Sequence, residues 1–162
     1  MDNEVVGQPA MINIETLDAR SAPARKLLAL SDEYAAALYP AESNHMESVD
    51  VLVQPNVLFL GGYVAGELVA CGAVKTMDDD DAYGEIKRVF VVDRFRGRGY
   101  SKEIMRRLEA HVHALDISLA RLETGIKQTE ALTLYRKLGY RERAPFGRYK
   151  LDPLSVFMEK RI

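Results

Sequence analysis

Arg88–Met105 reads RVFVVDRFRGRGYSKEIM, and this stretch indicates the fold more strongly than any other part of the chain. Its β-branched, apolar run ends at Asp93, a basic loop with Gly97 and Gly99 follows, and the pattern of a helix then begins. Where a strand, a glycine loop and a helix start meet, exposed backbone N–H groups and the positive end of the helix dipole converge on an anion. The stretch therefore predicts a site for a phosphate group.

Local charge supports this interpretation. Between Lys87 and Arg107 eight residues are basic and two, Asp93 and Glu103, are acidic, whereas the whole chain has a formal net charge of -2. A lone Gly-x-Gly also occurs in arginine-rich surface turns that bind nothing, so the flanking strand and helix are needed to support the site. The basic residues are Lys87, Arg88, Arg94, Arg96, Arg98, Lys102, Arg106 and Arg107.

The six residues Arg96-Gly97-Arg98-Gly99-Tyr100-Ser101 resemble the coenzyme A pyrophosphate loop of the GNAT superfamily of N-acetyltransferases. The family pattern is Gln/Arg-x-x-Gly-x-Gly/Ala, so Arg96 and Gly99 match and Ser101 departs. Serine is small, and close approach of the backbone to a pyrophosphate survives the change. The resemblance implies that backbone N–H groups from Arg96 to Lys102, including those of Gly97 and Tyr100, surround the pyrophosphate, while Arg96, Arg98 and Lys102 supply charge.

Two further stretches extend the likeness, which runs from about Met11 to the C-terminus. Glu85–Val91 resembles the fourth strand of the family. Gln128–Tyr140 resembles the family's Asn-x-x-Ala-x-x-x-Tyr-x-x-x-Gly-Phe helix, with Gln128 in place of Asn and Tyr140 in place of Phe. The stretch from Pro145 to Lys160 looks like the tail of a bacterial subgroup whose substrates are mostly unassigned.

Hydrophobic periodicity predicts a mixed α/β fold. A strand, a helix and a strand around Ser101–Leu115 indicate one right-handed βαβ unit with parallel strands. The rest of the central sheet, six or seven strands in all, is expected to be largely antiparallel, in a single GNAT-like domain over residues 11–162 with helices on both faces. Residues 1–10 are expected to be a flexible tail. The predicted strands are 11–17, 57–64, 67–75, 83–92, 118–123, 140–143 and 155–160; the predicted helices are 22–39, 101–115 and 130–138, with 48–53 uncertain.

Composition excludes several classes of protein. No apolar run approaches the roughly 20 residues that span a bilayer, and no signal pattern opens the chain, so we expect a cytoplasmic protein without membrane contact. The single cysteine, Cys71, excludes an internal disulfide and a cysteine-rich metal site. An acidic balance without interleaved aromatic and basic residues argues against nucleic acid as a partner. A dinucleotide fingerprint is incomplete, because no third glycine follows and Glu123 is poorly spaced for a ribose contact.

Acetyl transfer requires a held donor, a deprotonated amine, a stabilised oxyanion and a leaving thiolate. The resemblance implies that Glu85 is the general base and Tyr135 the general acid. It also implies that the Val89 N–H faces the thioester oxygen, which requires a β-bulge, and that the Val91 backbone and Gln128 contact the cofactor. Strand alternation would place Glu85, Lys87, Val89 and Val91 on one face. Glu85 could instead be a strand carboxylate paired with Lys87 or Arg88, and Tyr135 a core aromatic.

Other polar groups give weaker signals. His111 and His113 are two residues apart on a helix and share no face, so no metal site is expected. His45 borders the region that covers the acceptor in the resembling family and stays a weak candidate. Asp78–Asp81 reads as a solvated turn, although four acidic residues could also attract a cationic amine.

These residues predict an acetyl-CoA-dependent N-acetyltransferase without a metal, acting on a primary amine of a small molecule. Transfer should be direct within a ternary complex, since no nucleophilic cysteine or serine constellation is present. Three alternatives remain open: acetylation of a protein lysine or N-terminal amine, an acyl-CoA-binding regulator without catalysis, and a nucleotide- or RNA-binding domain. A homodimer is expected from the family alone.

Overall fold

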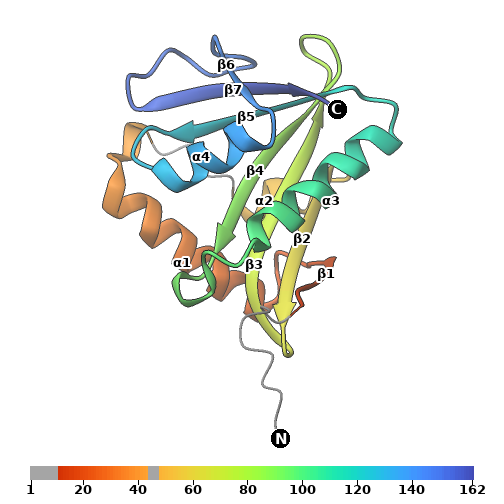
Figure 1. Ribbon diagram of the computed structural model, residues 1–162, viewed down its shortest axis with the longest axis vertical. Coiled ribbons are helices and arrows are strands. Elements are labelled where there is room, and N and C mark those ends of the chain that lie inside the picture. Colours follow the sequence, from red (N-terminus) through yellow and green to blue (C-terminus); the bar gives the residue numbers. More distant parts are fainter. Residues whose placement is uncertain (1–10, 44–47) are drawn as a thin grey trace, which may run out of the picture.

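The computed structural model describes residues 11–43 and 48–162, and the expected tail and His45 lie outside these ranges. Figure 1 shows a central sheet flanked by helices. The strands are β1 (Asn13–Thr16), β2 (Val57–Val64), β3 (Glu67–Met77), β4 (Tyr83–Val91), β5 (Leu119–Gly125), β6 (Arg141–Arg143) and β7 (Ser155–Arg161). The helices are α1 (Ala22–Leu38), α2 (Val49–Leu52), α3 (Tyr100–Ala114) and α4 (Thr129–Lys137), with short 3-10 turns η1 (Ala41–Ser43) and η2 (Asp93–Phe95).

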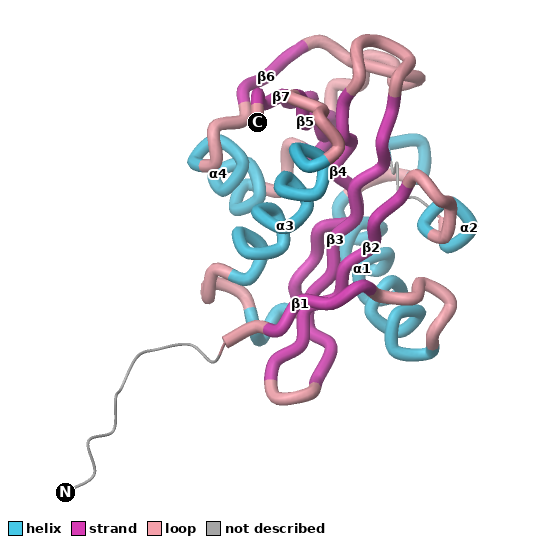
Figure 2. Tube along the Cα trace, turned by 90° about the vertical axis from the view of Figure 1, so that its right-hand side faces the viewer, coloured by secondary structure: helices cyan, strands magenta, loops and turns pink. Residues whose placement is uncertain are grey.

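The sheet has seven strands in the order β1-β2-β3-β4-β5-β7-β6. The pair β4–β5 is parallel and is connected through α3, while the other pairs are antiparallel. Figure 2 shows α1 and α2 on one side of the strands and α3 and α4 on the other. The predicted mixed sheet, its parallel pair and the helices on both faces are thus confirmed.

Local sequence signals set the ends of these elements. The Ser21 side chain caps α1 by accepting a hydrogen bond from the Ala24 N–H at 3.4 Å, and the helix ends just before Pro40. The β2–β3 hairpin turns at Ala65 and Gly66, whose φ values of 49° and 81° are those of a primed turn. Gly139, at φ 100°, follows α4 as predicted for a left-handed cap.

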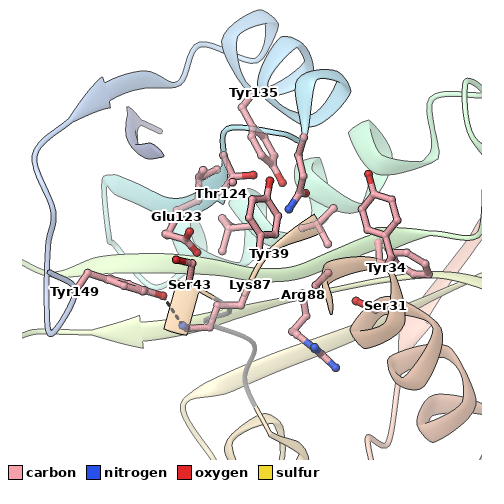
Figure 3. Close-up of a pocket in the computed structure, with 17 residues that line it drawn as sticks. Ser31, Tyr34, Tyr39, Ser43, Lys87, Arg88, Glu123, Thr124, Tyr135 and Tyr149 are labelled. Atoms are coloured by element: carbon pink, nitrogen blue, oxygen red, sulfur yellow. Dashed lines mark hydrogen bonds between the residues drawn. The ribbon is translucent and has the colours of Figure 1, made fainter. Parts of the chain in front are cut away.

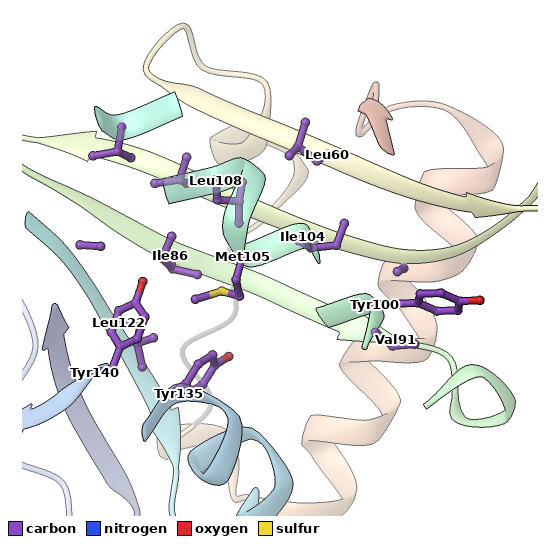
Figure 4. Close-up of a cluster of buried hydrophobic side chains, with 14 of the residues drawn as sticks. Leu60, Ile86, Val91, Tyr100, Ile104, Met105, Leu108, Leu122, Tyr135 and Tyr140 are labelled. Carbon is purple, nitrogen blue, oxygen red and sulfur yellow. The ribbon is translucent and has the colours of Figure 1, made fainter. Parts of the chain in front are cut away.

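Two apolar layers hold the sheet. On the α3 face, Met105, Leu108 and Val112 are fully buried against the sheet. The burial of each side chain contributes roughly 1.5–3 kcal/mol to the free energy of folding. Figure 4 shows this layer between α3 and the strands. A Cβ atom on Gly72 would lie 2.5 Å from the side chain of Ile104, so this glycine permits the close approach of α3. On the other face α1 packs over a second cluster that contains Leu27, Leu28, Phe59, Cys71, Ala73 and Phe90.

A bulge interrupts the ladder between β3 and β4. The register shifts between Cys71 and Ala73, so that Arg88 and Val89 lie opposite Gly72 alone, and Arg88 has φ 58°. One inserted residue reverses the alternation of side chains beyond it. Side chains before the bulge, such as Lys87, face the α1 side, whereas Val89 packs into the cluster on the α3 face. The expectation that Glu85, Lys87, Val89 and Val91 share one face is therefore wrong.

The parallel pair separates beyond its first residues. β4 and β5 are in register from Gly84 and Ala120 only as far as Ile86 and Leu122. Lys87–Val91 has no partner on β5, and the strands diverge toward the start of α3 and α4. This opening in the middle of the sheet positions the candidate site. Among the described residues no helix has the length and apolarity needed to cross a membrane.

Candidate active site

The opening between β4 and β5 contains two adjoining cavities. A cavity of about 660 Å³ runs from β4 to the start of α3 and to α4. A smaller one of about 110 Å³ lies under α1, between the diverging strands. The two cavities share part of their lining, so they adjoin, and together they are called the cleft. The shared residues are Tyr34, Val89, Phe90, Gln128 and Tyr135.

The larger cavity reaches the predicted anion loop. Gly97 and Gly99 have φ values of 76° and 81°, and a Cβ atom on either would meet no atom within 4 Å. Gly99 immediately precedes α3, whose first N–H groups have no partner within the helix. The arrangement offers an anion both backbone donors and the positive end of a helix dipole. Of the predicted loop residues, Arg96, Gly97, Gly99, Tyr100, Ser101 and Lys102 line the cavity.

Three loop side chains are engaged within the protein. Arg98 does not line the cavity, because it donates to the Arg94 carbonyl at 3.2 Å and lies over the Phe95 ring. The Arg96 Nε donates to the Val91 carbonyl at 2.9 Å, and its guanidinium lies 4.7 Å from the ring centre of Tyr34. The Tyr100 side chain is buried, which leaves its backbone to face a ligand.

Tyr135 stands at the junction of the two cavities. Its side chain comes from α4, is buried at 7 % exposure and lines both cavities. Burial raises the pKa of Tyr135 to about 12, and the negative charge of Glu123 acts in the same direction. The phenol therefore stays protonated at neutral pH and can donate a proton to a departing anion. Figure 3 shows Tyr39 and Tyr135 pointing into the cavity from opposite sides.

Val89 lines both cavities and lies at the bulge. Neither ladder gives it a partner, because the β3 register skips this position and the β5 register ends at Ile86. The bulge that an oxyanion donor at Val89 would require is present. Gln128, which immediately precedes α4, also lines both cavities.

Glu85 lies behind the wall of the smaller cavity. Glu85 is 5 % exposed and does not line either cavity. The Tyr149 hydroxyl donates to Glu85 Oε2 at 2.7 Å, and Lys87 Nζ lies 2.7 Å from the same oxygen. Lys87 also donates to the Tyr149 hydroxyl at 3.2 Å, and both of these residues do line the cavity. Lys87 and Tyr149 thus lie between Glu85 and the cavity, so a proton that Glu85 exchanges with a ligand would be relayed by one of these side chains or by water.

The family model for the acetyltransferase (GNAT) family matches residues 22–140. The chain belongs to the GNAT family of acetyltransferases. It is 43% identical over 129 residues to a protein of Azospirillum brasilense named IAA acetyltransferase, covering 80% of this chain and 84% of that one.

Solved structures of acyltransferases have a similar fold. A protein of Klebsiella pneumoniae, named for an inferred acyl-CoA N-acyltransferase activity, has a TM-score of 0.81 and 34% identity over 94% of this chain and 99% of that one. The PaiA N-acetyltransferase of Thermoplasma acidophilum, solved in complex with coenzyme A, has a TM-score of 0.71 at 16% identity over 94% and 99% of the chains, a likeness of fold.

Glu123 and Arg88 are among the charged residues of this GNAT cleft that were not proposed for the site from the sequence. Glu123 on β5 lines the smaller cavity and accepts a hydrogen bond from Ser155 Oγ at 2.9 Å. Its place at the end of the strand parallel to β4 was the available signal. Arg88 lines the same cavity from the bulge. The sequence offered no sign of its buried position, because strand alternation without a bulge places it on the opposite face.

Other sequence candidates lie elsewhere. His111 and His113 are on the last turn of α3, and neither lines the cleft. None of Asp78–Asp81 lines it either: Asp79 accepts from the Tyr83 hydroxyl at 2.7 Å and Asp80 pairs with Arg121 at 3.1 Å. Asp79 and Asp80 are thus held by contacts within the protein. Within residues 11–43 and 48–162 no group of three or more His, Cys, Asp or Glu side chains is placed to hold a metal ion.

Proposed function

We propose that this GNAT protein transfers the acetyl group of acetyl-CoA to a primary amine of a small molecule, by direct transfer in a ternary complex. One observation carries the proposal: the cavity that reaches the anion loop at the start of α3 adjoins a smaller cavity under α1, and Val89 and Tyr135 line both. A donor and an acceptor that enter from the two ends would bring their reacting atoms together at this junction.

The donor belongs in the larger cavity. The pyrophosphate of coenzyme A would bind the backbone N–H groups of residues 96–102, and the pantetheine arm would follow the free edge of β4 toward the junction. Because the Val91 carbonyl already accepts from Arg96, the Val91 N–H is the group available to the arm. Gln128 would border the arm from the α4 side. The coenzyme A complex of the Thermoplasma protein supports a donor of this class.

The chemistry at the junction follows from the same residues. The amine nitrogen forms a bond to the thioester carbon, and the Val89 N–H stabilises the oxyanion of the tetrahedral intermediate. The C–S bond then breaks, and the departing thiolate takes the proton of the Tyr135 phenol. The raised pKa of Tyr135, about 12, keeps that proton in place until the thiolate forms.

The proton of the incoming ammonium needs an acceptor. We assign this role to Glu85, which would receive the proton through the Tyr149 hydroxyl at 2.7 Å. A second candidate is Glu123, and the observation in its favour is that its carboxylate lines the cavity directly. Substitution of each carboxylate separates the two, as argued below.

The acceptor end favours a small molecule over a protein. The smaller cavity, about 110 Å³, is walled by α1, both diverging strands and the Tyr149 loop. A lysine on a folded protein would need an open groove for the flanking chain. The Azospirillum relative carries the name of an acetyltransferase for IAA, and this also supports a small acceptor.

The test has two steps with purified protein. Calorimetry measures the uptake of acetyl-CoA, and a colorimetric assay of thiol release follows turnover with small amines, lysine-containing peptides and peptides with free N-termini. We expect micromolar uptake and turnover with small amines. Turnover with peptides alone would move the activity to protein substrates, and uptake without turnover on any amine would indicate a regulator. Absence of uptake would refute the assignment of the loop.

A further inference from the structure

Arg88 lines the smaller cavity, and its buried guanidinium lacks part of its hydrogen bonding. The Arg88 side chain is 3% exposed, and its Nη1 donates to Asp32 Oδ1 of α1 at 2.7 Å. Its Nε is buried and has no hydrogen-bond partner among the described residues. Arg88 also has φ 58°, a backbone conformation that non-glycine residues adopt infrequently.

A donor of this kind calls for an explanation in physical terms. An arginine stays charged in proteins, and burying a charged donor without an acceptor destabilises the fold. Native proteins hydrogen-bond the large majority of buried polar groups, and strain, a catalytic role or a bound water or ion explains an exception. Because the guanidinium fork matches a carboxylate in two parallel hydrogen bonds, the natural occupant is a carboxylate.

The opposite charge is present on the facing strand. Glu123 of β5 lines the same cavity as Arg88 of β4, and Figure 3 shows them on either side of Tyr39. A ligand bound there would meet a cation and an anion at different points of the wall. The nearby Lys87 ammonium is held by Glu85 at 2.7 Å, and the Arg88 Nη1 is held by Asp32 at the same distance. Arg88 differs in its buried Nε, which has no partner among the described residues and is the donor suited to a ligand.

We propose that the acceptor is an amino acid, whose carboxylate binds the Arg88 guanidinium while its amino group lies on the Glu123 side and faces the thioester. This assignment rests on the proposed function and names the substrate class of the same site. The carboxylate would fix the molecule, and the amine would be held near the junction where Val89 and Tyr135 act. Amines without a carboxylate lack the group that Arg88 would bind.

Matched acceptor pairs test the proposal. Each of a series of α- and ω-amino acids is compared with its own amide, which differs only in the anionic group. Thiol release gives kcat/KM for each member, and the measured quantity is the ratio of acid to amide. The α-amides have the more readily deprotonated amine, so intrinsic reactivity favours the amide. We expect at least one acid to exceed its amide by roughly 10- to 100-fold, the size of a lost charged hydrogen bond.

Two variants locate the preference. Arg88→Asn removes the guanidinium and introduces a residue that accepts a positive φ. We expect the ratio to fall by roughly 10- to 100-fold toward one, with the change mostly in KM for the acid. Arg106→Asn is the matched control, because it removes the same charge from the exposed surface of α3. Its ratio should equal that of the unsubstituted protein. Melting curves and acetyl-CoA titrations confirm that each variant is folded and binds the donor.

The outcomes separate this proposal from the one on which it rests. Equal rates for acids and amides, or a preference that survives Arg88→Asn, would overturn the amino acid assignment and leave the acetyltransferase intact. If no amine is acetylated, calorimetry of the same pairs with the complex of protein and coenzyme A decides. If an acid binds more tightly than its amide and Arg88→Asn abolishes this difference, the carboxylate site is supported and the catalytic function is not. If acid and amide bind equally, both the carboxylate site and the catalytic function are refuted.

Discussion

The Tyr149 hydroxyl donates to Glu85 Oε2 at 2.7 Å, and this hydrogen bond joins the loop after β6 to β4 across 64 positions of sequence. Tyr149 is itself held by aromatic neighbours: its ring centre lies 5.3 Å from that of Phe146 and 5.4 Å from that of Phe157. The carboxylate that the family resemblance marks as a base is thus presented to the cleft through a fixed phenol. If Glu85 is the base, as proposed, the late loop takes part in the catalytic arrangement.

This relationship predicts that Glu85→Gln and Tyr149→Phe have similar effects. Each removes one member of the route from the amine to the carboxylate, so each should lower kcat by roughly 10²-fold or more. The acetyl-CoA affinity should stay nearly unchanged, because neither residue lines the larger cavity. Steady-state kinetics with the best acceptor, together with calorimetry, measures both quantities.

Glu123→Gln supplies the comparison for these two variants. If Glu85 is the base, Glu123→Gln should raise the KM of the acceptor and leave kcat within a few-fold. A full loss of kcat in Glu123→Gln, with near-normal kcat in the other two variants, would transfer the base to β5 and reduce Glu85 to a structural partner of Lys87.

The anion loop predicts a second pair of variants. Gly99 and Gly66 both have φ 81°, and a Cβ atom on either meets no atom within 4 Å. Valine at either position should therefore cost a similar 1–2 kcal/mol or so of backbone strain. Only Gly99→Val places a side chain where the pyrophosphate would bind. We expect it to abolish acetyl-CoA uptake in calorimetry, whereas Gly66→Val, in the β2–β3 turn, should retain it. Uptake by both variants would mean that the loop does not hold the cofactor.

The sequence was sufficient to predict the helices, the strands and their order, but it was not sufficient to predict the bulge in β4. Glycine and proline mark the ends of α1, the β2–β3 turn and the cap of α4, and local chemistry fixes each of these. The bulge at Arg88 carries no such mark, because a non-glycine residue occupies the positive φ and long-range pairing with Gly72 enforces it. The same long-range geometry brings Tyr149 onto Glu85 and Glu123 into the cleft, so neither contact was visible as a local pattern.

A buried network of ion pairs predicts that the stability of the fold depends on pH. Arg121 is 3% exposed, and it contacts Glu159 at 2.6 Å and Asp80 at 3.1 Å. Burial raises the pKa of Glu159, but hydrogen bonds from Arg121 and Arg143 outweigh it, and the net pKa lies below 4.5. A carboxylate with a lowered pKa in the folded state stabilises the fold above its unfolded pKa, and this stabilisation is lost as pH falls through the folded value.

Melting temperatures between about pH 3 and pH 7 check this dependence. The unsubstituted protein should lose stability as pH falls below about 4.5, the ordinary value for Glu159. Glu159→Gln should be less stable at pH 7, because the buried Arg121 loses one anionic partner, and its acid-dependent loss should be smaller. Parallel curves for the two proteins would assign the acid sensitivity to other carboxylates.

Cys71 should be unreactive in the folded protein. Burial raises the pKa of the Cys71 thiol to about 12, and its Sγ donates to the Arg88 carbonyl at 3.2 Å. The thiolate is the nucleophile that reacts with thiol reagents, so the native protein should not be labelled at neutral pH, whereas the denatured protein should give one equivalent per chain. Mass spectrometry after treatment measures both. Rapid native labelling would show that the layer between α1 and the sheet opens.

Tyr135→Phe removes the phenol that we propose protonates the leaving thiolate. We expect kcat to fall by roughly 10²-fold with little change in acetyl-CoA affinity. Because the pKa of Tyr135 is about 12, this residue should not titrate between about pH 7 and pH 10. The pH profile of kcat for the variant should therefore parallel that of the unsubstituted protein at a lower level.

Tyr140→Phe is the matched control. The Tyr140 ring centre lies 5.9 Å from that of Tyr135 (Figure 4), and its hydroxyl donates to Glu109 at 2.8 Å. Tyr140 does not line the cleft. That variant should lose about 1 kcal/mol of stability and keep its kcat. An alkaline loss of activity that disappears with Tyr135→Phe would place the pKa of this phenol within the working range and contradict its assignment as a permanently protonated acid.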